Sequence, residues 1–395
     1  MANVSSSNGI EKYPKLRFSN YNTSWDGIRF GDLIEEFSDR TKDEDEDVLL
    51  SAAIEGMFLN TELFGHQRGA SNKGYKKITY GTLVLSTQNL HLGNANVNLR
   101  FEHGMVSPAY KTYKIKNCSV KLLAEWIKSE KAKQFFYDAT TVGASVCRRN
   151  VEWETLYDQF LYLPSDIEQN HISDFLALIS ERIHKQELFI ENLKKYKRGL
   201  LQAVFSREVQ FKNSSSWERR VFSEIASLSK GKYSPKQNEV IPCIELEHLE
   251  QQTGQIIGHT NSNEQSSVKS VFHKGDVLFG KLRPYLRKFA LPEYDGVCSS
   301  EIWVFHPEHG IDSTFLFYLI QSEGFITSAN ISSGTKMPRA EWSKVSNESY
   351  FVPEISEQRR IANLLATIDK RIVNASASVN MFHLLKHGLL QQLFI

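Results

Sequence analysis

Residues 164–202 read PSDIEQNHISDFLALISERIHKQELFIENLKKYKRGLLQ, and residues 353–391 read PEISEQRRIANLLATIDKRIVNASASVNMFHLLKHGLLQ. In both stretches residues recur at alternating steps of four and three, which is the heptad spacing of a helix that packs along a seam. The apolar seam positions are Ile172, Leu176, Ile179, Ile183, Ile190, Leu193 and Leu200 in the first stretch, and Ile361, Leu365, Ile368, Ile372, Val379, Phe382 and Leu389 in the second. Each stretch predicts a helix of about 33 residues, roughly 50 Å long at 1.5 Å per residue.

Both helices begin with signals that suit a helix N-terminus. Pro164 is followed by Ser165 and Glu168 at capping-box spacing, and Pro353 is followed by Glu354 and Glu357. The helices could pack on their own globular parts, or pair with each other as a spacer. Their equal length and register favour pairing, because neither helix can bury such a stripe alone.

Landmarks outside the helices recur at nearly the same offset. Trp25-Asp26 returns as Trp217-Glu218, and Thr82-Leu83-Val84 is matched by Asp276-Val277-Leu278. The order of landmarks is the same throughout, so the chain is a tandem duplication. We predict globular parts at 15–163 and 207–352, helical parts at 164–206 and 353–395, and a disordered N-terminus at 1–14.

Each globular part is expected to be mixed α/β. Short runs rich in β-branched and aromatic residues predict strands at residues 82–86, 113–115, 277–279 and 302–305. Helical periodicity appears around residues 120–137 and 313–326. The fold class is therefore α/β (mixed α+β), with two tandem globular domains and two long antiparallel helices that form a coiled coil.

Composition limits what the chain can be. Its 395 residues hold 47 Lys plus Arg against 46 Asp plus Glu, so any nucleic-acid surface must be a local patch. The sequence has no secretory signal and no run of 18 apolar residues, and its four cysteines are far apart, so we expect a cytoplasmic protein without disulfides or a zinc site. The acidic run 39–47 predicts a solvated loop that phosphate would repel.

Catalytic motifs are missing. The sequence contains no phosphate-binding G-x-x-x-x-G-K-[ST] loop, no G-x-G and no adjacent prolines, and His306 and His309 lack the spacing of a helical zinc motif. We therefore expect no catalytic residue, no cofactor and no metal in this chain. A binding protein is the class that these absences favour.

Basic residues cluster in the second copy. The cations are Lys281, Arg283, Arg287 and Lys288, with Tyr285 among them, directly after an apolar strand. Such a loop can neutralise phosphates and place an Arg or Tyr against bases, although a solvated basic turn would have the same composition. Further polar residues at loop positions extend the candidate DNA-binding set: Ser299, Ser300, Glu301, Lys336 and Arg339.

The matching stretches of the first copy hold different polar residues. They are Gln88, Asn89, His91, Ser107, Tyr110, Lys111, Arg148 and Arg149. Asn and Gln can pair bidentately with adenine, and Arg with guanine, in the major groove. Two copies with one frame and different contact residues are what two readers of different DNA sequences would require.

Several of these segments resemble a known family. Residues 275–288, 296–302 and 334–338 are similar to a target recognition domain of type I restriction-modification specificity subunits, and residues 352–362 and 197–202 resemble the start and end of that family's helical region. The resemblance covers residues 15–395. The first copy differs at residues 143–148, which lack the proline that follows Met337.

The resemblance implies a function. Such subunits place one recognition domain on each part of a split, asymmetric double-stranded DNA target. Two methylation subunits supply the adenine-N6 chemistry and S-adenosylmethionine, and restriction subunits supply ATP- and Mg-dependent translocation and cleavage. This chain would then be a non-catalytic subunit that binds no membrane.

Two alternatives belong to other classes. The chain could be the targeting part of a type IIG-like or orphan methyltransferase or nuclease, against which the absent methyltransferase motifs argue. It could also be a coiled-coil assembly factor that never touches DNA, against which the basic loops argue.

Overall fold

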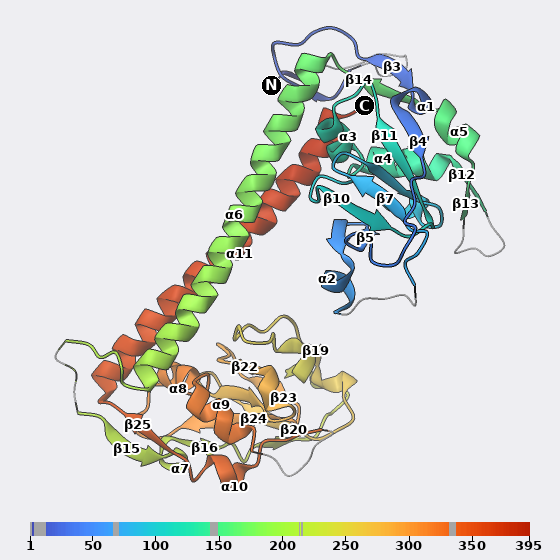
Figure 1. Cartoon of the computed structure of the whole chain (residues 1–395). Helices are drawn as coiled ribbons and strands as arrows, with labels where there is room; N and C mark the ends of the chain where they lie inside the picture. The colour runs from blue at the N-terminus through green and yellow to red at the C-terminus, as the bar shows by residue number, and fades with distance from the viewer. Residues whose placement is uncertain are drawn as a thin grey trace. The chain divides into compact units, whose positions relative to one another are not determined.

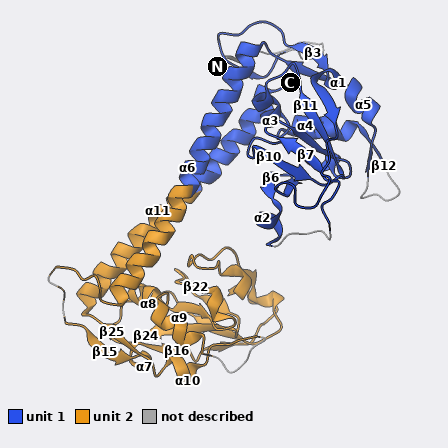
Figure 2. Ribbon diagram, in the orientation of Figure 1, with its two compact units in different colours: residues 1–187, 377–395 blue, residues 188–376 orange. Residues whose placement is uncertain are grey.

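The computed structural model describes residues 2–3, 13–65, 71–142, 149–212, 214, 216–331 and 337–395. The chain forms two compact units, residues 1–187 with 377–395 (unit 1) and residues 188–376 (unit 2), as Figures 1 and 2 show. Both units contain parts of the two long helices, so the domain limits inferred from sequence stay a prediction.

Unit 1 is built around one four-stranded sheet with the order β4-β11-β8-β9. These strands span Ile34–Phe37, Tyr110–Ile115, Leu83–Ser86 and Ala95–Val97. The described residues of unit 1 also form five strand pairs: β1 (Ala2–Asn3) with β2 (Leu16–Arg17), β3 (Asp26–Arg29) with β14 (Phe160–Leu163), β5 (Leu50–Ala53) with β6 (Gly56–Leu59), β7 (Lys76–Thr79) with β10 (His103–Val106), and β12 (Thr140–Val142) with β13 (Arg149–Val151). The helices are α1 (Phe30–Leu33), α2 (Asn60–Phe64), the 3-10 helix η1 (Leu90–Leu92), α3 (Val120–Trp126), α4 (Glu130–Asp138) and α5 (Trp153–Asp158).

Unit 2 repeats this plan. Its four-stranded sheet has the order β16-β24-β21-β22, with strands Ala226–Leu228, Ile302–Pro307, Val277–Gly280 and Phe289–Ala290. A second sheet has the order β17 (Lys232–Tyr233), β20 (Lys269–Phe272), β23 (Gly296–Cys298), β18 (Pro242–Ile244) and β19 (Thr260–Asn261), and β15 (Glu218–Val221) pairs with β25 (Ser349–Val352). The helices are α7 (Phe222–Ile225), η2 (Leu246–His248), η3 (Ser262–Glu264), η4 (Pro284–Leu286), α8 (Ser313–Leu319), α9 (Glu323–Ala329) and α10 (Trp342–Val345).

One inner strand of each four-stranded sheet, β8 in unit 1 and β21 in unit 2, is buried on both faces. In β8, Leu83 and Leu85 belong to the core that includes α3 and α4, whereas Val84 belongs to a second cluster with β5, β7 and β10. In β21, Val277 and Phe279 belong to the core with α8 and α9, and Leu278 faces the second sheet. Side chains alternate between the faces of a strand, so a strand covered on both sides becomes a continuous apolar run. The shared strand order and burial confirm the mixed α/β duplication.

The two shorter stretches that were predicted to be helical, residues 120–137 and 313–326, differ from the prediction in one respect. Each is two helices, α3 and α4 in unit 1 and α8 and α9 in unit 2. Ser129 Oγ accepts a hydrogen bond from Ala132 N at 3.1 Å, and Ser322 Oγ accepts one from Phe325 N at 3.4 Å. A serine cap at these positions starts a new helix without disturbing the apolar pattern.

The two long helices are α6 (Asp166–Phe205) and α11 (Ile355–Leu393). Within unit 1, Ser180 contacts Lys386 and Glu187 contacts His383; within unit 2, Phe189 contacts Arg371 and Lys197 contacts Asp369. Partner numbers fall as α6 numbers rise, so the helix segments run antiparallel inside each unit. All the predicted apolar seam positions are buried or half-buried.

The two packing alternatives both occur, in different parts of the helices. Ile172 and Leu176 join the core of unit 1 together with Leu390 and Leu393. Leu201 and Val204 join the core of unit 2 together with Ile361, Ala362 and Leu365. Ile183, Ile190, Leu193, Ile368, Ala375 and Val379 are buried outside these clusters. The helix ends therefore pack into the cores of the globular parts, and the residues in the middle of the helices pack along the seam.

The capping box expected at the start of α6 is not formed. Glu168 instead accepts two hydrogen bonds from Arg17, both at 2.7 Å, in a pair that is 0% and 5% exposed. The next residue ties the helix to its globular part in both copies. In the first copy, Gln169 Nε2 donates to Pro164 O at 3.0 Å, and its Oε1 accepts from Ser119 N. In the second copy, Gln358 Nε2 donates to Pro353 O at 2.9 Å, and its Oε1 accepts from Asp312 N. These glutamines hold the N-termini of α3 and α8 against the long helices.

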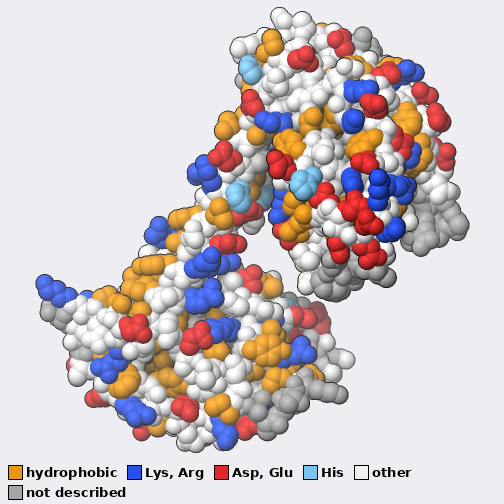
Figure 3. Space-filling view, viewed as in Figure 1, with side chains coloured by type: hydrophobic (Ala, Val, Ile, Leu, Met, Phe, Trp, Pro, Cys, Tyr) orange, Lys and Arg blue, Asp and Glu red, His pale blue; other side chains and the backbone are white. Residues whose placement is uncertain are grey.

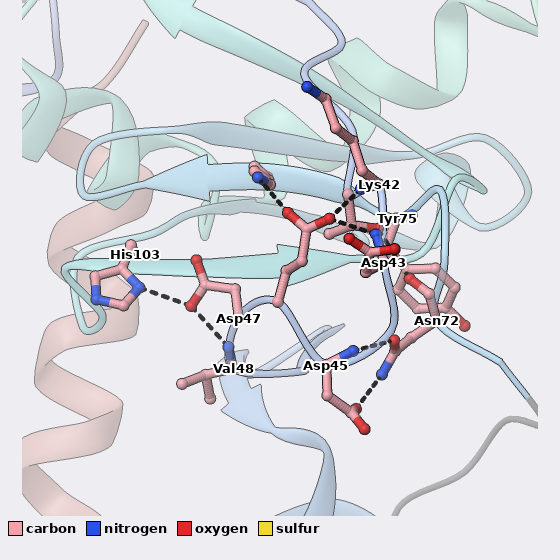
Figure 4. Close-up of polar contacts among 11 residues, drawn as sticks. Lys42, Asp43, Asp45, Asp47, Val48, Asn72, Tyr75 and His103 are labelled. Carbon is pink, nitrogen blue, oxygen red and sulfur yellow. Dashed lines mark hydrogen bonds and ion pairs between the residues drawn. The ribbon is translucent and has the colours of Figure 1, made fainter.

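The acidic run 39–47 is more structured than a solvated loop. Glu46 forms an ion pair with Lys77 at 2.6 Å and accepts hydrogen bonds from backbone N–H groups of the same loop. Asp45 pairs with Asn72, and Asp47 pairs with His103 at 2.6 Å, as Figure 4 shows. Most of the run is an exposed loop, as predicted. The sequence did not show its basic and amide partners, because these come from distant strands and loops.

Three of the four cysteines lie among the described residues. Cys118, Cys243 and Cys298 are free thiols, and burial raises the pKa of each. Cys147 lies outside the described residues, as do most of residues 1–14, although Ala2–Asn3 (β1) pair with Leu16–Arg17 (β2). No helix in the described ranges has the length and apolar character to cross a membrane.

Candidate nucleic-acid interface

The basic loop of unit 2 connects β21 to β22 through η4. Arg283 and Arg287 flank η4 with φ values of +52° and +51°, the left-handed region that non-glycine residues seldom adopt. Arg283 N donates to Pro338 O at 2.8 Å, which holds this conformation in place. Strained backbone of this kind costs of order 1–3 kcal/mol and clusters at functional sites.

The four cations of this loop have different roles. Arg287 forms an ion pair with Glu323 at 2.6 Å, and Lys288 Nζ donates to Leu246 O at 2.6 Å. The side chains of Lys281 and Arg283 have no ion pair or hydrogen bond to another described residue, and Tyr285 is 51% exposed. Arg287 and Lys288 therefore shape the loop, whereas Lys281, Arg283 and Tyr285 are available to a ligand.

Backbone hydrogen bonds join the loop to two other segments of the predicted set. Lys281 N donates to Glu301 O at 2.9 Å, and Ala340 N donates to Lys281 O at 2.8 Å. Ser299 and Ser300 lie beside Glu301 in the turn between β23 and β24, where Ser299 is half-buried and Ser300 exposed. Lys336 lies outside the described residues. Residues far apart in sequence thus form one surface.

Glu301 and Arg339 form an ion pair on this surface. Arg339 Nε donates to Glu301 Oε2 at 3.0 Å, and Nη2 donates to Oε1 at 3.2 Å. This hydrogen bond and the charge of Glu301 raise the pKa of Arg339. Sequence reasoning selected both residues but missed their pairing, because 38 positions separate them.

The corresponding loop of unit 1 follows β8. Gln88 and Asn89 are exposed, and their backbone N–H groups donate to Ser86 Oγ. His91 lies in η1, and burial, together with the charge of Arg149, lowers its pKa. Its Nδ1 has no partner among the described residues. A neutral imidazole suits hydrogen bonding better than phosphate neutralisation.

Other predicted residues of unit 1 are used internally. Tyr110 Oη donates to Ala52 O at 3.2 Å, and Arg149 donates to Thr140 and covers the ring of Tyr137 at 4.1 Å. Ser107 Oγ accepts from Ala109 N at 3.3 Å. Arg148 lies outside the described residues. Tyr110 and Arg149 therefore hold the domain together in this structure, and the exposed side chains of Gln88 and Asn89 have no hydrogen bond to another described residue.

Lys111 is also committed to internal contacts. Its Nζ forms an ion pair with Glu36 at 2.8 Å and lies over the ring of Trp153 at 4.3 Å. Burial works against its charge, but the hydrogen bonds to Glu36 and Tyr157 leave its pKa raised. Lys111 is therefore a cation neutralised within the protein.

A pocket in unit 1 lies beside Lys111, whose Nζ contacts Glu36 and Tyr157 of the pocket lining. It has a volume of about 340 Å³, and its lining includes Arg29, Asp32, Glu36, Tyr113 and Asp158. Three carboxylates face one arginine there, which does not favour an anionic ligand. Among the residues that the structure describes, no group of three His, Cys, Asp or Glu side chains could hold a metal ion.

Charge is mixed over both units. Figure 3 shows Lys, Arg, Asp and Glu side chains interspersed on the visible face of each. A formal charge of +1 on the whole chain agrees with this pattern. Any contact with DNA must therefore rest on local groups such as Lys281 and Arg283 and not on a broad basic face.

The class of protein follows from comparison with known families. Residues 214–378 match the family model described as the type I restriction modification DNA specificity domain. Over these residues the chain is therefore similar to the DNA specificity domain of type I restriction-modification systems.

Two relatives resemble the chain over most of its length, and one solved structure shares its fold. The EcoDI specificity subunit of Escherichia coli is 24% identical over 73% of this chain and 73% of its own length. The MjaVIII specificity subunit of Methanocaldococcus jannaschii is 25% identical over 88% of this chain and 87% of its own length. A chain from a structure titled for complex assembly and conformational transition of the type I R-M system shares the fold, with a TM-score of 0.58 at 15% identity over 94% of this chain and 97% of that one.

Proposed function

We propose that this specificity subunit recognises a bipartite, asymmetric double-stranded DNA target, with one half read by each globular part. One observation carries the proposal: the equivalent turns after β8 and β21 present different polar groups on the same frame. Gln88 and Asn89 are exposed in one, and Arg283 and Tyr285 are exposed in the other, next to the half-buried Lys281. Amide side chains suit adenine and guanidinium groups suit guanine, so the two turns would prefer different bases.

The chain would select the DNA target and hold the partner subunits together, but it would carry out no covalent chemistry. Methyl transfer to adenine N6 requires S-adenosylmethionine and a pocket for the flipped base. We propose that two methylation subunits contribute both, and that restriction subunits contribute the ATP- and Mg-dependent steps in the cytoplasm. The solved structure that shares this fold is described as showing complex assembly of the type I R-M system, which supports such partners.

Reconstitution tests the proposal. The purified chain is mixed with candidate methylation subunits, and adenine methylation is measured across a genomic DNA library. Sequence-specific methylation only in the mixture is the expected result. Methylation by the chain alone would favour the targeting part of a self-contained methyltransferase, and intact assembly without specific methylation would favour an assembly factor.

A further inference from the structure

Glu301 occupies one edge of the guanidinium group of Arg339. The carboxylate accepts from Nε and Nη2, and the structure gives Nη1 no partner among the described residues. The Arg339 side chain is 49% exposed and that of Glu301 is 28% exposed. The edge formed by Nη1 and the second N–H of Nη2 is therefore held in a fixed plane and available to a ligand.

This arrangement suits a base better than a phosphate. A carboxylate in contact with the guanidinium cancels most of its net charge and repels a nearby phosphate oxygen. A guanidinium fixed in one plane has already lost part of its rotamer freedom, so less entropy is lost when it forms two parallel hydrogen bonds. Guanine O6 and N7 are the paired acceptors that a planar Arg contacts bidentately in the major groove.

The neighbouring cations contrast with this pair. Lys281 and Arg283 have no acidic side chain as partner in the described ranges, and the backbone of the loop holds both beside the pair through Glu301 O and Pro338 O. Unneutralised cations at the margin of a surface are suited to phosphate contacts, which position a protein without reading sequence. The same surface thus contains two electrostatically different kinds of basic group.

We propose that Arg339 reads a guanine in the half-target of unit 2, that Glu301 is the residue that positions it, and that Lys281 and Arg283 contact phosphates. The inference rests on the proposed function and assigns it to particular residues.

The test uses the full chain in the complex that methylates DNA in the reconstitution above. The variants are Arg339→Lys, which keeps the charge but loses the fork; Glu301→Gln, which keeps the shape but loses the charge; and Lys281→Ala as a matched control. Methylated sites in a library are sequenced. Affinity for the preferred duplex and for a random-sequence 30-base-pair duplex is measured at several salt concentrations.

Arg339→Lys should lose the preference for guanine at one position of one half-target, with affinity for the preferred duplex about 10- to 100-fold lower. Its salt dependence should stay close to that of the unmodified chain. Glu301→Gln should bind the random duplex more tightly while its preference for guanine falls, an opposite pair of changes that a merely structural defect would not cause. Lys281→Ala should bind all sequences more weakly, with a salt slope smaller by about one unit.

The assignment is overturned if Arg339→Lys keeps the site preference of the unmodified chain. It is also overturned if Arg339→Lys loses as much salt slope as Lys281→Ala. The proposed function stays intact in both cases. If the unmodified complex methylates no specific sequence, the proposed function fails first and the assignment fails with it.

Discussion

At the scale of single residues, the buried pair of Arg17 and Glu168 bears directly on stability. Both side chains are buried, and each carboxylate oxygen accepts one hydrogen bond from the guanidinium. Removing one member of such a pair leaves an uncompensated buried charge, whereas replacing both by apolar groups costs far less.

Glu168→Ala should therefore lower the free energy of unfolding of unit 1 by about 3–5 kcal/mol. The measurement is urea unfolding followed by tryptophan fluorescence. Glu181→Ala is the control, because Glu181 forms an exposed ion pair with Lys185 on the same helix and its loss should change stability far less. Arg17→Met with Glu168→Leu should recover much of the loss. An equal loss in Glu168→Ala and in the control would contradict this account.

Glu46 offers a pH-dependent prediction. Its hydrogen bond to Lys77, followed by those from the backbone of its own loop, lowers its pKa from 4.5 to about 2. A carboxyl whose pKa is depressed in the folded state contributes stability above its unfolded pKa and loses that contribution as the pH falls towards the folded value.

The stability difference between the natural chain and Glu46→Gln should therefore be constant near pH 7 and shrink between pH 4.5 and about pH 2. Urea midpoints across this range measure the difference. A difference that grows on acidification would show that Glu46 is not held as a carboxylate by Lys77.

At the scale of helices, two equivalent lysines join the long helices to their globular parts. In unit 2, Lys197 Nζ contacts Asp369 at 2.7 Å and Gln321 at 3.1 Å. In unit 1, Lys386 Nζ contacts Ser180 at 2.7 Å and Glu125 at 2.8 Å. The acidic partner is on the helix in one unit and on the globular part in the other, so the repeat keeps the lysine and changes its partners.

Lys197→Met should weaken unit 2 by about 2 kcal/mol, because hydrogen bonds to charged groups are worth about 1.5–3 kcal/mol. Hydrogen exchange should then quicken in residues 188–205 and 355–376, with residues 166–187 and 377–393 unaffected. Lys386→Met should give the reverse pattern and serves as the matched control. Identical exchange patterns in the two variants would show that the helices respond as one cooperative body.

At the scale of the whole molecule, each unit has its own hydrophobic core. The core of unit 1 is centred on residues such as Trp25, Phe30 and Phe136, and that of unit 2 on Phe222, Phe305 and others. Separate cores should allow one globular part to be exchanged without loss of the other.

Replacing residues 15–163 by the matching part of a relative should therefore change one half of the methylated target and leave the other half unaltered. The replacement must keep a partner for Glu168 and for Gln169, because both residues contact the exchanged part. Sequencing of methylated sites checks the outcome. If both halves of the target change together, recognition is not modular.

The sequence alone determined the features that depend on periodicity and repetition. Heptad spacing is local, so the long helices were predictable from residues such as Ile172 and Ile361, and the buried strands from apolar runs such as residues 83–85. The duplication was visible because equivalent landmarks keep their order. The family resemblance followed from the same segments.

Only the tertiary structure decided which charged groups are free. Four cations are of the residue types that contact DNA but are paired within the protein. Lys111 pairs with Glu36 and Arg149 with Thr140. Arg287 pairs with Glu323, and Lys288 donates to Leu246 O. The pairing of Glu301 with Arg339, and of Glu168 with Arg17, was likewise invisible in the sequence. Apolar patterning is set by neighbours a few positions away, whereas a charged side chain pairs with groups that the fold brings from distant positions, and no local signal records that partner.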